Sequence, residues 1–190
     1  MKEVMAKGPN FVYAKEFIQR EYGEVVWKSL MASLSPEESA IWMGSPLVHE
    51  IYPFRIFKSL IYALTKLLEK REDSETTGIY EYIADRSLNI LYKLFFRFAD
   101  PSFVIKNYPR LWIRFFDSGD VEVPLSEKSH AILKFTLPEI FLDWIYPACL
   151  GYSKKAVEMA GGKNLTVVEK SKAILPDNSW EIVYELNWTE

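Results

Sequence analysis

The chain has 190 residues, of which 49% are hydrophobic and 15% aromatic, and its formal net charge at pH 7 is −3. This length and composition are typical of a globular chain with a well-filled core, and we expect a single domain over residues 1–190. A slightly acidic chain has no general attraction for nucleic acid or anionic lipid, so neither is expected as a partner.

The first part of the chain shows helical periodicity. A first helix is predicted from Asn10, as its N-cap, to Gly23, and a second over residues 24–34. Ser35 is followed three residues later by Glu38, which is the signature of a capping box. This pair predicts the start of another helix.

The middle of the chain is predicted to be helical as well. Residues 52–72 form the clearest amphipathic pattern, residues 71–78 a polar loop, and residues 79–100 a helix that is apolar on most of its circumference. Asp100 is expected to cap a further helix with an aromatic inward face and arginines at its rim. Gly119 should end that helix in a left-handed conformation.

The hydrophobic period then changes from 3.6 to 2. Residues 120–137 predict two strands, residues 139–162 a long helix that Pro147 should kink or split, and residues 164–188 two more strands. Helices segregated from hairpin strands indicate an α+β fold. We expect a helix-rich N-terminal half packed with a four-stranded antiparallel sheet, made of two hairpins separated by a long helix.

Four stretches carry a resemblance to a known group of proteins: FIQREYGEVVWKSLMASLSPEES, YPFRIFKSLIYAL, YPRLWIRFFDSGDVEV and AGGKNLTVVEKSKAI with WEIVYELNW. The chain resembles uncharacterised bacterial domains, multiplied in myxobacteria. They belong to the superfamily of TRAPP transport-complex subunits, four-vinyl-reductase-type domains and haem-nitric-oxide-binding (H-NOX) sensors. The resemblance covers nearly the whole chain and rests on the pattern of residues, not on catalytic residues.

The resemblance implies a compact α+β domain, often dimeric through its helices. Relatives hold an apolar guest, such as an acyl chain or a porphyrin, between helices and sheet, and others act as scaffolds. This sequence lacks the Tyr-x-Ser-x-Arg run of H-NOX haem sites and the paired C-terminal cysteines of many four-vinyl-reductase-type domains. Haem is therefore possible as a cofactor, but no motif supports it.

Motifs for catalysis are missing from the sequence: it has no nucleophile elbow, phosphate-binding loop, dinucleotide fingerprint or His-Glu-x-x-His. His49 could be an axial ligand only if haem is bound, and is otherwise a surface or structural imidazole. Cys149, the single cysteine, could be a nucleophile, but a buried inert thiol is favoured. A non-enzymatic domain is expected.

The same features predict the compartment. One cysteine excludes an internal disulfide, which fits a reducing environment. The first ten residues lack the apolar core of a signal peptide. The longest nearly uncharged stretch, residues 140–153, is too short to span a bilayer. We therefore expect a cytoplasmic protein without membrane insertion.

Two similar stretches, residues 52–55 and 108–112, combine a tyrosine, a proline, an arginine and apolar residues. Their arginines could flank an apolar cavity and pair with an acidic group on a guest, or form ordinary surface ion pairs, which is favoured. The aromatic residues could wall a pocket or fill a core. The candidate ligand-binding residues are Tyr52, Arg55, Tyr92, Phe95, Arg110, Trp112 and Trp144.

Two functions follow from these alternatives. The first is a non-enzymatic binding or sensory domain for an apolar or haem-like small molecule. The second is a structural or protein-interaction module, a homodimer or scaffold, in which the apolar band within residues 52–68 is partly exposed in the monomer. An internal cavity of a few hundred Å³ would favour the first function.

Overall fold

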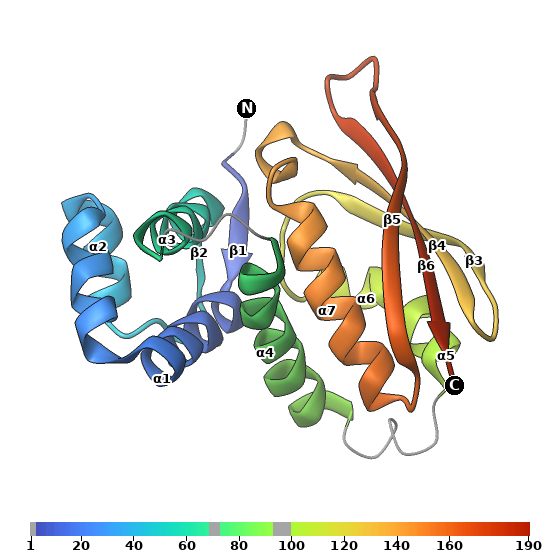
Figure 1. The fold of residues 1–190 in the computed structure, drawn as a ribbon. Coiled ribbons are helices and arrows are strands. Elements are labelled where there is room, and N and C mark those ends of the chain that lie inside the picture. The colour runs from blue at the N-terminus through green and yellow to red at the C-terminus, as the bar shows by residue number, and fades with distance from the viewer. Residues whose placement is uncertain (1–2, 69–72, 93–99) are drawn as a thin grey trace.

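The computed structural model describes residues 3–68, 73–92 and 100–190, with the side chains of 3–68, 77–88 and 100–190 (Figure 1). Its helices and strands follow the α+β order expected from the sequence. Within the described residues, no helix is both long enough and apolar enough to cross a membrane.

The N-terminal part consists of β1 (Met5–Lys7), α1 (Gly8–Ser33), α2 (Pro36–Met43), β2 (Ile51–Pro53) and α3 (Phe54–Leu67). The two short strands pair antiparallel with each other. Sequence periodicity did not predict them, because three residues are too few to show alternation. They bring the beginnings of α1 and α3 together at one end of the helical layer (Figure 1).

The two helices predicted before residue 35 are one helix with a break. Gly23 has φ 78° and ψ 177°, which interrupts α1 where the first helix was expected to end. Asn10 is not an N-cap, because α1 begins earlier and the buried Asn10 amide donates to the Phe115 carbonyl (3.1 Å). The capping box is confirmed: the Glu38 N–H donates to the Ser35 hydroxyl, and the Ser35 N–H to the Glu38 carboxylate.

The middle of the chain forms α4 (Asp73–Tyr92), α5 (Pro101–Lys106) and α6 (Tyr108–Trp112). The prediction of a loop over residues 71–78 is wrong from Asp73 onward, because α4 already begins there. Asp100 caps α5 as expected, by accepting a hydrogen bond from the Phe103 N–H (2.9 Å). The predicted aromatic helix is divided into α5 and α6. Gly119 has φ 80°, which confirms its left-handed conformation.

The predicted four-stranded antiparallel sheet is present, with strand order β3-β4-β6-β5. Every second residue of β4 faces the core and is buried, and β6 follows the same alternation from its third residue to Trp188. This pattern is why the sequence predicted the strands well. The strands are β3 (Asp120–Ser126), β4 (His130–Leu137), β5 (Lys163–Ile174) and β6 (Trp180–Thr189).

The prediction of one long helix over residues 139–162 is wrong. The segment forms a short 3-10 helix, η1 (Glu139–Phe141), and then α7 (Ile145–Met159). Pro147 does not kink α7, because it lies in the first turn, where a missing N–H costs no helical hydrogen bond. The division therefore falls before Pro147.

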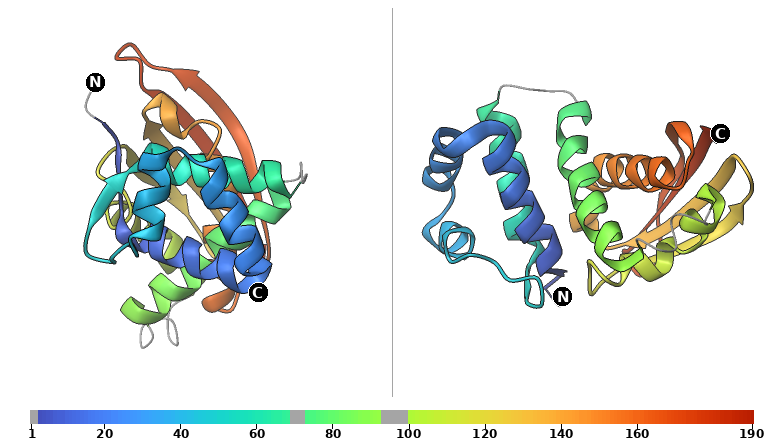
Figure 2. Two further views of the ribbon diagram at one scale, coloured as in Figure 1. Left: turned by 90° about the vertical axis from the view of Figure 1, so that its left-hand side faces the viewer. Right: turned by 90° about the horizontal axis from the view of Figure 1, so that it is seen from below.

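The elements form layers. Seen from below in Figure 2, the sheet is followed by α7, then α4, and then the helices of the N-terminal part. Gly151 of α7 lies at the α7–α4 crossing, where a Cβ would stand 2.5 Å from the Thr77 carbonyl oxygen. The absence of a side chain at Gly151 therefore allows the two helices to lie close together.

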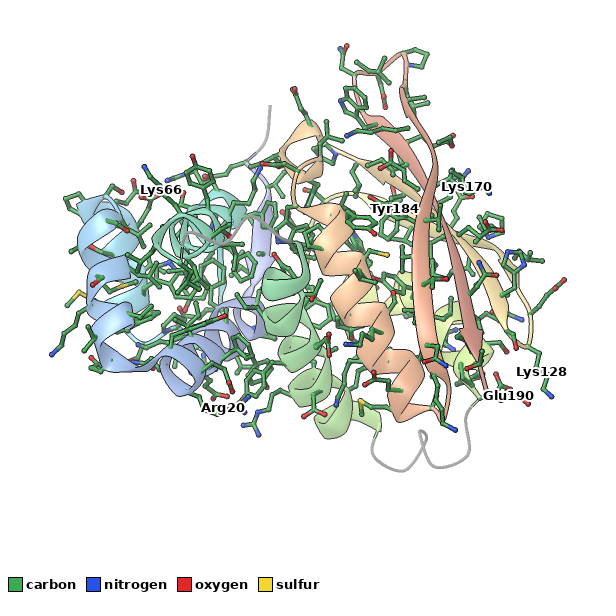
Figure 3. The ribbon with its side chains drawn as sticks, viewed as in Figure 1. Arg20, Lys66, Lys128, Lys170, Tyr184 and Glu190 are labelled. Carbon is green, nitrogen blue, oxygen red and sulfur yellow. The ribbon has the colours of Figure 1, made fainter. Side chains whose placement is uncertain are left out.

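Strand β5 is an edge strand and is exposed at most of its positions. Its pairing with β6 shifts register twice, between Lys163 and Thr166 and between Glu169 and Ser171. Lys170, labelled in Figure 3, donates from this strand to the Glu185 carboxylate (3.0 Å).

Candidate functional site

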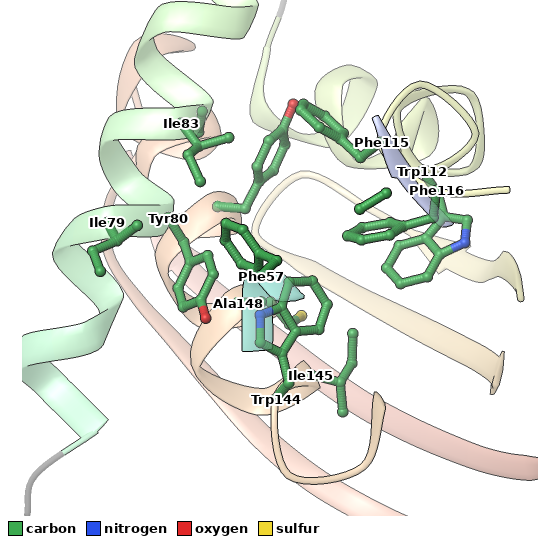
Figure 4. Close-up of a cluster of buried hydrophobic side chains, with 14 of the residues drawn as sticks. Phe57, Ile79, Tyr80, Ile83, Trp112, Phe115, Phe116, Trp144, Ile145 and Ala148 are labelled. Carbon is green, nitrogen blue, oxygen red and sulfur yellow. The ribbon is translucent and has the colours of Figure 1, made fainter. Parts of the chain in front are cut away.

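An aromatic cluster lies where α3, α4, α6 and α7 meet (Figure 4). The ring of Trp144 packs edge-on against Phe54 and Phe116, at centroid distances of 5.0 and 5.2 Å. Such edge-to-face pairs each stabilise a core by about 0.5–1.5 kcal/mol beyond the area they bury. The aromatic cluster comprises Phe54, Phe57, Tyr80, Trp112, Phe116, Phe141 and Trp144.

A cavity of about 40 Å³ lies against this cluster. Its walls come from the start of α1, from α4, from α6 and the turn after it, and from α7, and they are mostly apolar. A water molecule needs about 10–15 Å³ of such space, so the cavity has room for about three non-hydrogen atoms. Ligand pockets of ordinary size measure about 300–1,000 Å³, so this is not a pocket for a large guest.

Two polar atoms at the cavity wall stand out. The Tyr80 hydroxyl and the Trp144 indole nitrogen are both buried, and neither completes a well-formed hydrogen bond with a described residue, although the Trp144 N–H lies close enough to the Tyr80 hydroxyl to affect its pKa. Figure 4 shows them pointing toward one another. Burial raises the pKa of Tyr80, against a smaller opposing effect of the Trp144 N–H, so the phenol stays protonated. An acceptor atom placed between them could accept from both.

Cys149 is a second polar group at the cavity wall. Its sulfur lies 3.9 Å from the Ser153 hydroxyl, and its side chain is fully buried. Burial raises the pKa of this thiol to about 12, while the Ser153 and Tyr108 hydroxyls act in the opposite direction. A thiol with this pKa is protonated at neutral pH and is not a nucleophile.

This pKa has a consequence for alkaline stability. A cysteine in an unfolded chain ionises near pKa about 8.5. The pKa of Cys149 is higher in the folded chain, so raising the pH ionises the thiol first in the unfolded chain. The free energy of unfolding is therefore unaffected by this thiol below about pH 8.5. It falls by about 1.4 kcal/mol per pH unit as the pH rises from there toward 12. Between pH 8 and pH 10, the free energy of unfolding of wild type, measured by urea denaturation, should therefore fall by about 2 kcal/mol more than that of Cys149→Ala. A difference that does not change with pH would contradict the raised pKa.

Of the predicted site residues, Trp112 and Trp144 line the cavity. The Trp112 indole N–H also donates to the carbonyls of Ser118 and Gly119 (both 3.1 Å). Tyr52 is half-buried away from the cavity, and its hydroxyl donates to the Glu50 carboxylate (2.9 Å). The side chains of Tyr92 and Phe95 lie outside the described residues.

The two predicted arginines lie at the surface and not at the cavity. Arg55 donates to the carboxylates of Glu3 (2.9 Å) and Glu37 (2.6 Å). Arg110 is exposed, and its one hydrogen-bond partner within the described part of the chain is the Asn107 side-chain oxygen, at 3.5 Å. These positions correspond to the interpretation of ordinary surface ion pairs. Among the described residues, no Lys or Arg lines the cavity to pair with an acidic guest.

Sequence reasoning missed Tyr80, Ile83 and Ala148, which also line the cavity. A signal for the last was present: Ala148 stands four residues from the bulky Trp144 and four from Tyr152 on the same face of α7. A small residue between two large ones leaves a space, which stays open as a cavity unless side chains of neighbouring helices fill it.

No family model and no curated protein matches the chain. Solved structures do match: an unliganded Fe(II) H-NOX protein from K. algicida has a TM-score of 0.72 at 13% identity, over 97% of both chains. An oxygen-binding H-NOX domain related to soluble guanylate cyclases has a TM-score of 0.70 at 9% identity, over 97% of this chain and 95% of the other. This chain has the H-NOX fold. The likeness to TRAPP subunits and four-vinyl-reductase-type domains stays a prediction.

A further match, an H-NOX structure from work on haem distortion, has a TM-score of 0.73 at 9% identity. The residues present on this H-NOX fold do not fit a haem. His49 is exposed and His130 lies 3.0 Å from the Glu185 carboxylate, and neither lines the cavity. The cavity thiol is protonated, and about 40 Å³ is far too small for a porphyrin. The described residues also contain no group of three or more His, Cys, Asp and Glu side chains able to hold a metal.

Proposed function

We propose that this chain is a non-enzymatic binding domain, folded as one unit, that senses a small neutral guest in the cavity between α4, α6 and α7. The observation that carries the proposal is the buried pair of donors, Tyr80 and Trp144, at the wall of a small apolar cavity. Unpaired buried donors are costly, and a guest that accepts from them recovers that free energy.

The size and chemistry of the wall define the class of guest. Room for about three non-hydrogen atoms favours a molecule with one acceptor atom and an otherwise apolar body. A charged guest is disfavoured, because burying a charge without a counter-charge is expensive and the two predicted arginines lie elsewhere. The guest we propose is therefore smaller than an acyl chain or a porphyrin.

Xenon and acetonitrile test this proposal, because each has a suitable size and only acetonitrile has an acceptor atom. Both should bind saturably at one site, and only acetonitrile should strongly shift the Trp144 indole N–H resonance. Ala148→Leu should abolish both responses by filling the cavity. Ala40→Leu, on the exposed side of α2, is the matched control and should leave them unchanged. Equal responses in both variants would reject the cavity as the site.

Haem titration provides a second test. Adding hemin to the purified protein should give no stoichiometric Soret band, because the cavity is small and no histidine faces it. A 1:1 band that disappears in His49→Ala would show that the chain rearranges to bind haem, and the proposed guest size would be wrong.

The interaction-module function requires an exposed surface, and the apolar band of α3 offers little of one. Phe57, Leu60, Ile61 and Leu64 are buried in the core, whereas Leu67 at the end of the band is 43% exposed. This arrangement gives little support for a homodimer through that band. A different surface, on α5 and α6, has the properties of an interface.

A further inference from the structure

A row of exposed side chains runs along the outer side of α5, α6 and the turn after them. Phe103 and Ile113 are large apolar residues, yet they are 52% and 61% exposed. The row is exposed throughout, whereas Val104, Ile105, Leu111 and Trp112 between its members are buried. We call it the basic–apolar stripe; it comprises Phe103, Lys106, Arg110, Ile113 and Arg114.

The stripe is positively charged in a chain of net charge −3. Within the described part of the chain, Lys106 and Arg110 form no ion pair, and Arg110 has only the weak contact with Asn107. Lys7 adds a further cation at one end, where its ammonium donates to the Ile113 carbonyl (2.7 Å).

The acidic residues near the stripe lie at its two ends and are engaged by the chain itself. Asp100 caps α5 and accepts from the Ser102 hydroxyl (2.5 Å). Asp117 accepts from the Met5 N–H (2.9 Å) and from the Ser118 hydroxyl. The middle of the stripe therefore offers positive charge between two exposed apolar side chains.

We infer that the basic–apolar stripe docks an acidic amphipathic helix of a partner protein. Carboxylates on such a helix would pair with Lys106 and Arg110, and its apolar residues would cover Phe103 and Ile113. Phe103 lies on α5 and Ile113 directly follows the end of α6, so the two apolar residues stand on consecutive short helices. Arginine and large aromatic or aliphatic side chains are also the residues that dominate binding at interfaces.

Other anionic partners fit the stripe less well. Nucleic-acid binding normally engages many phosphates, whereas the stripe has only a few cations, flanked by apolar residues, on an acidic chain. An anionic membrane would attract each basic residue only weakly, and two short helices expose little apolar area for insertion.

The test uses a fluorescent 14-residue helical peptide with leucines at positions i, i+4 and i+7 and glutamates beside them. Its binding is measured by anisotropy in 50 and 150 mM NaCl, against a scrambled peptide of the same composition. Wild type should bind the helical peptide saturably and more tightly than the scrambled one. Lys106→Glu with Arg110→Glu should weaken binding at least tenfold.

The matched control is Lys28→Glu with Lys66→Glu, which changes the net charge equally at exposed positions of α1 and α3 (Lys66 is labelled in Figure 3). It should bind within twofold of wild type. Phe103→Ser with Ile113→Ser should weaken binding by a similar factor at both salt concentrations, because the apolar contribution is not screened. Thermal melting establishes that each variant is folded.

Three results would overturn the inference. The first is the absence of saturable peptide binding by wild type, and the second is equal weakening by the stripe and control charge reversals. The third is tighter binding to phosphatidylserine vesicles or to duplex DNA than to the peptide, which would assign the stripe to a lipid or nucleic-acid surface.

Discussion

Replacing Trp144 with alanine is expected to lower the free energy of unfolding by about 3–5 kcal/mol, measured by urea denaturation. The indole is 6% exposed and has ring contacts with Phe54, Phe116 and other members of the aromatic cluster (Figure 4). Its removal takes away both the buried area and these contacts, and leaves a hole that the surrounding rings cannot close fully.

Trp180→Ala is the control for this effect, because that tryptophan is only half-buried at the start of β6. Trp180→Ala should lower the free energy of unfolding by less than half as much as Trp144→Ala. Benzene should raise the melting temperature of Trp144→Ala, because it can occupy the new apolar space, and should have no comparable effect on wild type. Equal losses in the two tryptophan variants would show that the cluster around Trp144 is not a major source of stability.

Gly151→Ala should be the second most damaging change, with a loss of about 3 kcal/mol in the free energy of unfolding. The new Cβ would meet the Thr77 carbonyl oxygen at 2.5 Å and the Tyr80 Cβ at 3.0 Å. Because the first of these atoms belongs to the backbone of α4, the two helices must separate. The cavity lies along the same pair of helices, so the xenon response should change in this variant as well.

Gly78→Ala provides the comparison, since Gly78 is also inside a helix. A Cβ there would meet only the end of the Phe17 ring, at 3.2 Å. The gain in helix propensity, about 1 kcal/mol, should largely offset that contact, so the net change should stay below about 1 kcal/mol. A loss in Gly78→Ala as large as that in Gly151→Ala would show that helix separation is not the cause.

Local physics explains which parts of the fold could be predicted. The capping box at Ser35, the left-handed Gly119 and the alternating strands depend on neighbours within a few residues, and the sequence predicts all three. The β1–β2 pair depends on contacts between residues far apart in the chain, such as Met5 with Pro53. Whether Pro147 kinks its helix depends on how far it lies from the helix start. Only the structure shows that α7 begins two residues before Pro147.

The residues of the candidate site could likewise be predicted only in part. Trp112 and Trp144 were predicted from helical spacing and do line the cavity, because apolar side chains at that spacing turn inward. Arg55 was grouped with them, but its partners Glu3 and Glu37 lie 52 and 18 residues away in the chain. Neither these partners nor the cavity volume can be read from periodicity, because both depend on how separate elements pack.

Strand β5 bears on how the protein behaves at high concentration. A long edge strand is a template to which another chain can add by backbone hydrogen bonds, and such growth leads to aggregation. Here two bulges interrupt the strand. If copies of the chain stacked in register along this edge, Lys163, Lys170 and Lys172 would each lie beside the same lysine of the next copy, and their charges would repel. The edge is thereby protected against self-association, and concentrated solutions should stay clear without a partner to cover this strand.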